Sequence, residues 1–480
     1  MRTSRRSFGT LALLVWSASL AVACDGDSAS EIAPSTSSPS EEAAGAPQAE
    51  IVQLSRVGQD RLYGVTRDES GASYAVGQIT NSAAANADTS LLIAKFTAAG
   101  ELDPSFGGIG FVTRNVTPGT NGELFRSIVV QSSGKIVVAG TAEHLGRADA
   151  RDRDIAVLRF NPDGTVDDRF GANGIVRIDL STGVANGTEF SADGAWGMVR
   201  YDDDRLVISG RAVRDGKLGT ELVLARLTPD GGSDRSFGTN GVFLLDMQVT
   251  GASGSANPGD VTLLPDGAGL IGTGVQSLPD GGSAPVLYKV SDDGVLDTSF
   301  GNNGVFNQSV LTAQTELYAV AVQPTADGGY KLVTAGFGRE LESETTDLLS
   351  LRLTSDGALD PSYGNAGLVL ADIGGFADDS RKLGVLSDGR ILLVGGGGLG
   401  SSGADGLAML LTADGAPDTS FAPGGFRTFD LGGPADFFWD LALSRDASTA
   451  VIVGFEGVGS APASATDNDD AALLLLPLSY

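Results

Sequence analysis

Hydrophobic residues in this chain gather in short segments, and polar turn residues separate these segments at close intervals. One stretch shows the pattern, because segments 175–180, 196–201, 205–210 and 221–227 are rich in leucine and β-branched residues and are bounded by Gly, Asp or Asn. Such segments are typical of β-strands, and the turn residues between them favour antiparallel hairpins. The sequence therefore predicts many short strands rather than helices.

A sequence signature, Gly-x-x-Asp-x-x-Phe-Gly-x-x-Gly, recurs along the chain, with 58 to 67 residues between the first glycines of successive copies. We name the three strands of each interval a, b and c, and the strand after each signature d. The glycines would allow a turn from c to d, the aspartate would accept backbone N–H bonds there, and the aromatic ring would pack between neighbouring blades. Recurrence once per unit favours a structural role. The aspartate and aromatic positions are Asp103 and Phe106, Asp167 and Phe170, Asp234 and Phe237, Asp297 and Phe300, Asp360 and Tyr363, and Asp418 and Phe421.

The strand count indicates how the repeats close. Triplets of strands a, b and c occur seven times, from 62–96 to 439–476, whereas strand d follows a signature only six times. Segment 51–54, ahead of the first triplet, supplies the missing strand, and such closure hides the terminal sheet edges of a propeller. We therefore expect residues 51–480 to form an all-β fold, a β-propeller of seven four-stranded blades whose last blade is closed by the N-terminal strand.

The copies resemble the delta-60 repeat of bacterial exported proteins. Asp-Pro-Ser-Phe-Gly at 103–107 and Asp-Pro-Ser-Tyr-Gly at 360–364 carry the likeness best, together with a Val-Ala-Gly strand at 136–140 ahead of segment 155–160. The resemblance covers nearly all of the chain beyond residue 50 and implies a repeat fold and export, with no defined reaction. In the sixth copy Ala422 and Pro423 replace the usual Gly-x pair, so we expect a rearranged turn there.

The N-terminus has the features of an export signal. Its first residues include Arg2, Arg5 and Arg6, and segment 11–22 is apolar but too short to span a bilayer comfortably, which predicts a signal peptide over 1–23. The segment Ser4-Arg5-Arg6-Ser7-Phe8 also resembles a twin-arginine signal, so the export route stays open between that system and the general secretory one.

The residues after the apolar stretch predict an anchor and a tether. Leu20-Ala21-Val22-Ala23-Cys24 resembles a lipobox, so we expect Cys24 to be acylated and to hold the protein in a membrane. Segment 24–50 is rich in Ser, Pro, Ala and Glu and is expected to be a disordered tether. We therefore expect an exported protein, lipid-anchored at the cell envelope on the periplasmic or cell-surface side.

The composition limits the chemistry. The formal net charge is −28, and such a surface repels nucleic acid, so we expect no nucleic-acid partner. The chain has one cysteine, which excludes a disulfide, a thiolate metal site and a cysteine nucleophile in the mature fold. The one histidine, His144, has no identified catalytic partner, and no nucleophile elbow or phosphate loop is present. The sequence thus gives no catalytic residue and leaves enzymatic activity open.

The loops distinguish the two faces of the predicted ring. Loops a–b and c–d are short and repetitive, whereas loops d–a and b–c, which form the irregular face, vary, and variable loops on a rigid scaffold favour binding. Aromatic and basic residues at the starts of strands a are expected near the mouth of the central channel on this face. The alternative is that they cap the core between blades. The candidate ligand contacts are Trp196, Trp439, Tyr318, Phe125 and Arg126.

Acidic runs in the b–c loops raise the question of calcium, which prefers hard oxygen ligands. No cofactor is predicted otherwise. None of the runs has the twelve-residue loop spacing of a known calcium motif, so solvated loop charges are the alternative interpretation. The candidate residues are Asp149, Asp152, Asp154, Asp467 and Asp469.

These features together favour a binding or interaction module of the cell envelope. Its membrane contact would be the acyl anchor, and its partner would be an envelope protein, a peptide or a glycan. Two alternatives stay open. One is a propeller hydrolase or dehydrogenase with a carboxylate or calcium site on the irregular face, and the other is a purely structural envelope protein.

Overall fold

The computed structural model describes residues 49–478, apart from 53, 55–57, 81, 83–86, 120–121, 145–151, 182–192, 214–218, 248–255, 279–280, 343, 401–402 and 458–468. The expected signal peptide, Cys24 and all but the last two residues of the expected tether lie outside this range. No helix in the described part of the chain is long and apolar enough to cross a membrane.

Nearly all regular structure is β-strand. Two short 3₁₀ turns, Pro265–Gly267 and Pro423–Gly425, are the described exceptions. The strands, in chain order, are β1 (Ala49–Val52), β2 (Asp60–Arg67), β3 (Ser73–Thr80), β4 (Thr89–Phe96), β5 (Phe111–Arg114), β6 (Leu124–Val130), β7 (Ile136–Glu143), β8 (Arg153–Phe160), β9 (Ile175–Ile178), β10 (Gly194–Arg200), β11 (Leu206–Ala212), β12 (Glu221–Leu227), β13 (Val242–Leu245), β14 (Ala256–Leu263), β15 (Leu270–Ser277), β16 (Ser283–Val290), β17 (Val305–Phe306), β18 (Gln314–Pro324), β19 (Tyr330–Arg339), β20 (Asp347–Thr354), β21 (Leu368–Ala371), β22 (Asp378–Val385), β23 (Ile391–Gly400), β24 (Gly403–Leu411), β25 (Phe426–Phe429), β26 (Phe437–Leu443), β27 (Thr449–Glu456) and β28 (Asp470–Pro477).

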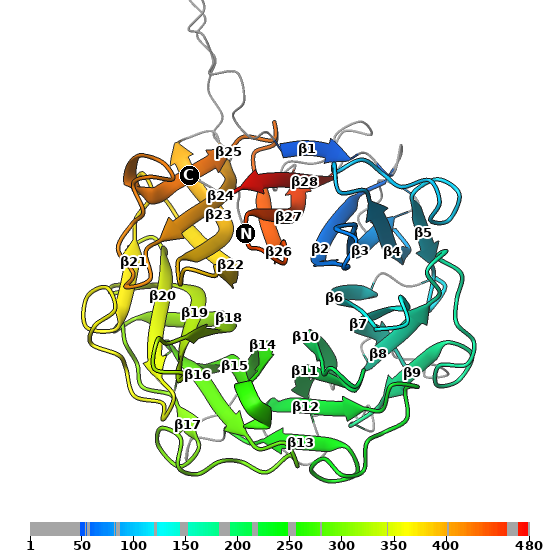
Figure 1. The fold of residues 1–480 in the computed structure, drawn as a ribbon, viewed down its shortest axis with the longest axis horizontal. Helices are drawn as coiled ribbons and strands as arrows, with labels where there is room; N and C mark the ends of the chain where they lie inside the picture. Colours follow the sequence, from blue (N-terminus) through cyan, green and yellow to red (C-terminus); the bar gives the residue numbers. More distant parts are fainter. Residues whose placement is uncertain are drawn as a thin grey trace, which may run out of the picture. The chain divides into compact units, whose positions relative to one another are not determined.

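The strands pair in antiparallel groups of four: β2–β5, β6–β9, β10–β13, β14–β17, β18–β21, β22–β25, and β26–β28 with β1. The groups β14–β17 and β18–β21 are joined into one sheet by the single parallel pair of Ser283 and Gln314. Figure 1 shows these groups arranged as a ring, with β2, β6, β10, β14, β18, β22 and β26 nearest its centre. The fold is therefore a β-propeller.

The ring closes through the N-terminal strand. β1 pairs with β28, with Ile51 opposite Ala472, and so completes the sheet of β26–β28. The strand begins at Ala49 and ends at Val52, two residues earlier than the segment 51–54 expected from the pattern. An otherwise open sheet edge is thereby paired.

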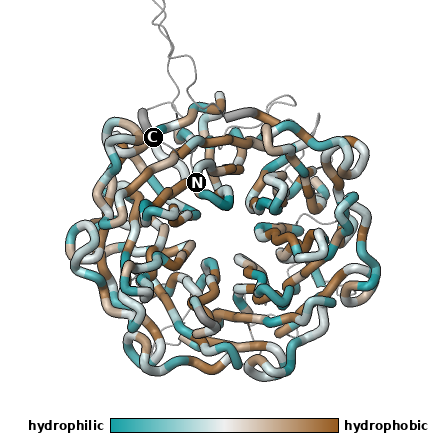
Figure 2. The backbone as a smooth tube through the Cα atoms, in the orientation of Figure 1, coloured by the Kyte–Doolittle hydropathy of each residue, from teal (hydrophilic) through white to brown (hydrophobic). Residues whose placement is uncertain are grey.

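The hydrophobic core lies between neighbouring sheets. One cluster joins Val76 and Ile93 of the first sheet to Ile136 and Leu158 of the next. Figure 2 shows the resulting pattern, with hydrophobic segments along the strands and hydrophilic residues concentrated in the turns. A further cluster contains residues from β2–β4 and from β27 and β28, so the first and last sheets pack as the others do.

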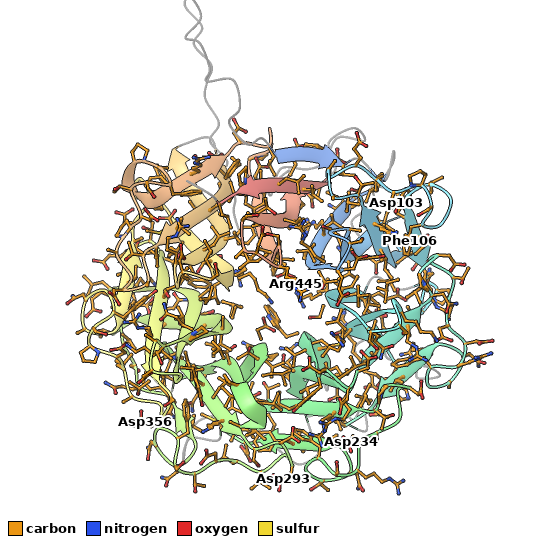
Figure 3. All side chains as sticks on the ribbon, viewed as in Figure 1. Asp103, Phe106, Asp234, Asp293, Asp356 and Arg445 are labelled. Atoms are coloured by element: carbon orange, nitrogen blue, oxygen red, sulfur yellow. The ribbon has the colours of Figure 1, made fainter. Side chains whose placement is uncertain are left out.

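Six signature turns link sheets that follow one another in the chain. Their aromatic rings are all buried, and the φ angles of the first glycines are positive. A Cβ atom on Gly231 would lie 2.9 Å from a carbon of the Phe170 ring, so glycine is needed both for its backbone conformation and for this close approach. In addition, the backbone N–H of Gly238 donates to the carbonyl of Asp293 in the next turn, at 2.8 Å. Figure 3 shows these turns at the outer part of the ring.

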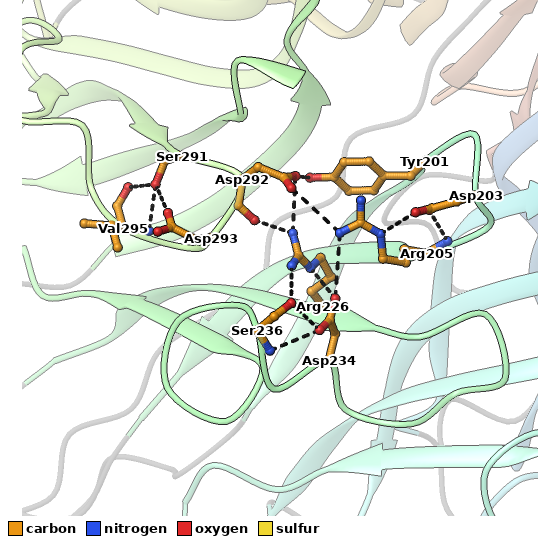
Figure 4. Close-up of polar contacts among 10 residues, drawn as sticks. All are labelled: Tyr201, Asp203, Arg205, Arg226, Asp234, Ser236, Ser291, Asp292, Asp293 and Val295. Atoms are coloured by element: carbon orange, nitrogen blue, oxygen red, sulfur yellow. Dashed lines mark hydrogen bonds and ion pairs between the residues drawn. The ribbon is translucent and has the colours of Figure 1, made fainter. Parts of the chain in front are cut away.

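The aspartate of the signature is held by a basic residue eight positions before it. Figure 4 shows the third copy, in which the Arg226 Nε donates to Asp234 Oδ2 at 2.8 Å. The other guanidinium nitrogens reach Ser236 Oγ at 3.0 Å and the carbonyl and carboxylate of Asp292, which belongs to the next turn. Asp234 Oδ1 accepts the Ser236 backbone N–H at 3.1 Å. Equivalent basic residues are Lys95, Arg159, Lys289 and Arg352.

The sixth copy departs from this arrangement. Leu410 occupies the basic position, and Arg390, directly before β23, binds Asp418 instead, at 3.2 Å. A 3₁₀ turn, Pro423–Gly425, replaces the usual turn, and Gly424 has a φ of 75°. Phe421 nevertheless stays buried, so the ring contact between sheets is kept.

We expect Phe237→Ala to lower the free energy of unfolding by about 3 to 5 kcal/mol, because it removes buried apolar surface and leaves a cavity between two sheets. Denaturant unfolding measures this change. Val295→Ala is the matched control, because the Val295 side chain is 58% exposed, and its effect should stay below about 0.5 kcal/mol. A nearly unchanged free energy of unfolding in Phe237→Ala would show that the Phe237 side chain does not hold the two sheets together.

Candidate ligand site in the central channel

A β-bulge interrupts each innermost strand near its start. In β6 the register with β7 shifts between Phe125 and Ser127, which leaves Arg126 outside the ladder. A bulge turns the side chain of the extra residue in a new direction. The other extra residues are Tyr63, Trp196 with Gly197, Gly259 with Asp260, Tyr318, Arg381 and Trp439.

These bulges bring side chains from different sheets to one pocket. Its cavity volume is about 40 Å³. Since a buried water needs roughly 10–15 Å³ measured in this way, the cavity has space for about three waters or one small chemical group. The pocket is lined by Tyr63, Arg126, Ser127, Trp196, Gly197, Asp260, Tyr318, Arg381, Lys382, Trp439 and Asp440.

Aromatic rings and guanidinium groups alternate around the pocket. The Arg126 guanidinium lies over Trp196 at 4.5 Å, and the ring centroids of Trp196 and Tyr318 are 5.5 Å apart. Arg381 lies over Tyr318 at 4.0 Å and is 5.2 Å from the Trp439 ring. Cation–π contacts of this kind are attractive, and they fix the ring orientations.

The two arginines differ in their acidic partners. Arg381 Nη2 binds Asp379 Oδ2 at 2.7 Å, so its charge is neutralised locally. Arg126 makes no ion pair or side-chain hydrogen bond among the described residues. Burial lowers the pKa of Arg126 to about 10, and the positive charges of Arg381 and Arg211 act in the same direction. Arg126 is thus a pocket guanidinium that makes no ion pair with a described residue.

An ion triad crosses the floor of the pocket. Lys382 Nζ lies 2.5 Å from Asp260 and 3.5 Å from Asp440, and these residues come from three different sheets. Asp440 also accepts the backbone N–H groups of Val65 and Leu441. Burial raises the pKa of Asp440 to about 6, against the opposing effect of Lys382. Lys382 therefore contacts both pocket carboxylates, and its single positive charge offsets one of their two negative charges.

Four of the expected ligand contacts line this pocket together: Trp196, Tyr318, Trp439 and Arg126. Phe125 does not. Its side chain is fully buried in the core between the first two sheets, because the bulge directs Arg126 to the channel and leaves Phe125 on the core side. The expectation that Phe125 contacts a ligand is therefore wrong, and the alternative of a core residue holds for it.

Tyr63, Asp260 and Asp440 are pocket residues that the sequence interpretation missed. An alignment of the innermost strands at the bulge would have found two of them, because Tyr63 follows a buried leucine as Tyr318 does, and Asp440 follows Trp439. The bulge itself has no recognisable residue signature in these strands.

The acidic residues considered for calcium are dispersed. Asp149 and Asp467 lie outside the described residues, Asp152 is buried, and Asp469 forms an ion pair with Arg61. Asp154 lies with His144 and Asp179, where the possible ligand atoms are within 4.8 Å of one another. Two comparable groups in the described residues are Asp347, Asp372 and Asp378, and Asp405, Asp430 and Asp436.

Three buried aspartates, Asp193, Asp378 and Asp436, bind backbone N–H groups of the segment that leads from the preceding sheet. Asp378 begins β22, and its oxygens accept the backbone N–H groups of Ile373 and Gly398, at 2.5 and 3.2 Å. Asp193 and Asp436 accept backbone N–H groups in the same way ahead of β10 and β26. Burial raises the pKa of Asp378 to about 7, and nearby carboxylates add to the effect. Burial also raises the pKa of Asp193 to about 7 and that of Asp436 to about 6.

The raised pKa values predict that the ring is more stable at pH 5 than at pH 8. In the unfolded chain an aspartate titrates near 3.9, so between these values the folded state holds more protons, and the free energy of unfolding falls as pH rises through about 7. We expect Asp378→Asn to remove about 1 kcal/mol of the difference in thermal or denaturant unfolding. Asp327→Asn, at an exposed aspartate with a lowered pKa, is the control and should act equally at both pH values. A ring that gains stability from pH 5 to pH 8 would contradict the prediction.

A family match agrees with the fold. Residues 131–170 and 386–421 match the family described as "Domain of unknown function (DUF5122) beta-propeller". No curated protein matches the sequence. Similar solved structures include an alpha-L-arabinofuranosidase from Fusarium graminearum (10% identity, TM-score 0.42, 73% of this chain and 92% of that chain). An alpha-L-arabinanase from Penicillium chrysogenum has 13% identity and a TM-score of 0.41, with the same coverage, and a protein from Lactobacillus plantarum has 14% and 0.41, with 77% and 83% covered. These identities assign no activity, and the sheet topology together with the family match identifies a β-propeller repeat protein.

Proposed function

We propose that this protein is an exported binding module of the cell envelope, and that its ligand site is the pocket at the centre of the ring. The carrying observation is the meeting of Trp196, Tyr318, Trp439 and Arg126, each from a different sheet, around one cavity. Aromatic faces with a few polar groups between them are the usual lining of ligand sites. The cavity volume of about 40 Å³ indicates that one small group of the ligand enters it.

The alternative of a purely structural envelope protein is less well supported at the central pocket. A core that served stability alone would pair its buried charges, because an uncompensated buried charge is costly. The ring satisfies this rule at Arg159, Arg226 and Arg352, which all bind aspartates. Arg126 is half-buried and makes no ion pair with a described residue, and this difference supports a binding role for the pocket.

The hydrolase alternative requires a carboxylic acid and a carboxylate that are free to exchange protons with a substrate. The pocket carboxylates are Asp260 and Asp440, and Lys382 contacts both. Two backbone N–H groups also bind Asp440. With both acids engaged in this way, the geometry favours binding over hydrolysis.

Replacing Trp196 and Trp439 together by alanine tests the site. The ring should be used to capture envelope proteins, peptides or glycans, and the double variant should lose at least tenfold in affinity for the ligand that the native ring retains, because both aromatic faces are gone. Phe376→Ala is the control, since Phe376 is an exposed aromatic residue that does not line the pocket. If the double variant unfolds instead, the aromatics belong to the core. If it binds like the native ring, the ligand site lies elsewhere.

The proposed location rests on acylation of Cys24, and Cys24→Ala tests it. The variant should move from the membrane fraction to the soluble fraction of cells, because the acyl group would be the anchor. Metabolic labelling with a radioactive fatty acid should be lost in parallel. Ser40→Ala, in the same expected tether, is the control. Retention of an unlabelled, folded Cys24→Ala protein in membranes would contradict the proposal.

A further inference from the structure

The central pocket contains hydrogen-bond donors without acceptors. The Nε atoms of Arg126 and Arg381 and the indole Nε1 of Trp439 are buried, and they make no hydrogen bond among the described residues. All three residues line the same cavity. Buried donors are nearly always satisfied in folded proteins, so three in one place point to an acceptor that occupies the cavity.

The charges of the described residues indicate the sign of that acceptor. The formal net charge of the chain is −28, yet no carboxylate lies within ion-pair distance of Arg126 among the described residues. The nearest acids are already engaged, because Asp379 binds Arg381 and Lys382 contacts both Asp260 and Asp440. An anion would therefore complete the pocket, because Arg126 supplies an unpaired positive charge.

The cavity further limits the size and charge of the anion. About 40 Å³ corresponds to roughly three water-sized sites, which is the number of heavy atoms in a carboxylate group. Asp260 and Asp440 also line the cavity, so a singly charged anion meets less repulsion there than a dianion such as phosphate. A carboxylate is planar and accepts two parallel hydrogen bonds from a guanidinium.

Resting on the proposed function, we infer that the pocket binds a carboxylate group of the ligand, with Arg126 as the main donor. The Trp196 ring, stacked on the guanidinium, holds it in place, and the indole N–H of Trp439 is available as a second donor. The carboxylate can come from the C-terminus of a peptide, from an acidic sugar, or from a free small acid.

The two pocket tryptophans provide the measurement. The chain has three tryptophans, of which Trp16 lies in the expected signal peptide; in protein that begins at residue 24 the other two, Trp196 and Trp439, both line the cavity. Their fluorescence is titrated with acetate, with a short peptide carrying a free or an amidated C-terminus, and with glucuronate or glucose. The free and amidated peptides form one pair of acid and neutral partner, and glucuronate and glucose form the other. We expect a saturable change in fluorescence with acetate or with the acid of at least one pair, and at least a tenfold weaker response to the neutral partner of that acid. The responding pair identifies the source of the carboxylate.

Substitution of Arg126 completes the test. Arg126→Gln should weaken carboxylate binding at least tenfold, whereas Arg126→Lys, which keeps the charge, should lose less. Arg339→Gln is the control, because Arg339 is paired with Glu342 and does not line the pocket. Should Arg126→Gln fail to fold, Arg126→Lys and the carboxylate-dependent rise in melting temperature of the native ring decide instead.

Equal responses to acid and neutral partners, or unchanged binding by Arg126→Gln, would overturn the inference. A different result would contradict the proposed function itself: unchanged binding of the captured envelope ligand by the Trp196 and Trp439 double variant. A ligand that needs both tryptophans but binds equally well after amidation of its carboxylates would support the proposed function and contradict the inferred carboxylate binding.

Discussion

The contact between successive signature turns is the interaction on which the ring depends. Each of the first five turns places a buried aromatic ring against the first glycine of the next turn, and a backbone hydrogen bond such as that from Gly238 to Asp293 runs beside it. The arginines add a second link, since Arg226 holds its own aspartate and also reaches Asp292. Five pairs of neighbouring sheets share this contact, whereas Gly100 lies against Leu473 and Leu475 of β28. The repetition of the signature follows from this geometric need.

The central pocket depends on a different constraint, the bulge in each innermost strand. A regular strand alternates its side chains between two core-facing sides, which would bury Arg126 and Trp196 between sheets. The bulge inserts one residue whose side chain is free of that alternation and is directed to the centre. The signature turns at the outer part of the ring can therefore repeat, while the residue at the bulge differs from sheet to sheet and is aromatic, basic or acidic.

The sequence was sufficient for the features that repeat. The four-stranded units, the closing role of the N-terminal strand and the turn position of Phe237 follow from alternating patterns and turn residues. Residue-level assignments failed where one position decides the outcome. Phe125 and Arg126 are adjacent and share a strand, and only the bulge separates the core residue from the pocket residue. The contact of Lys382 with Asp260 joins residues 122 positions apart from sheets that are not neighbours in the chain, which no local pattern encodes.

The pairing of β1 with β28 has a consequence for the order of folding. The closing strand is synthesised first and its partner last, with some 420 residues between Ile51 and Ala472. At a synthesis rate of about 5–20 residues per second, the N-terminal strand exists for roughly 20 to 80 seconds before its partner is made. During that time the first sheets can form locally, but β1 has no partner strand. Ring closure through β1 thus has to follow the synthesis of β28, which gives synthesis and closure a fixed order.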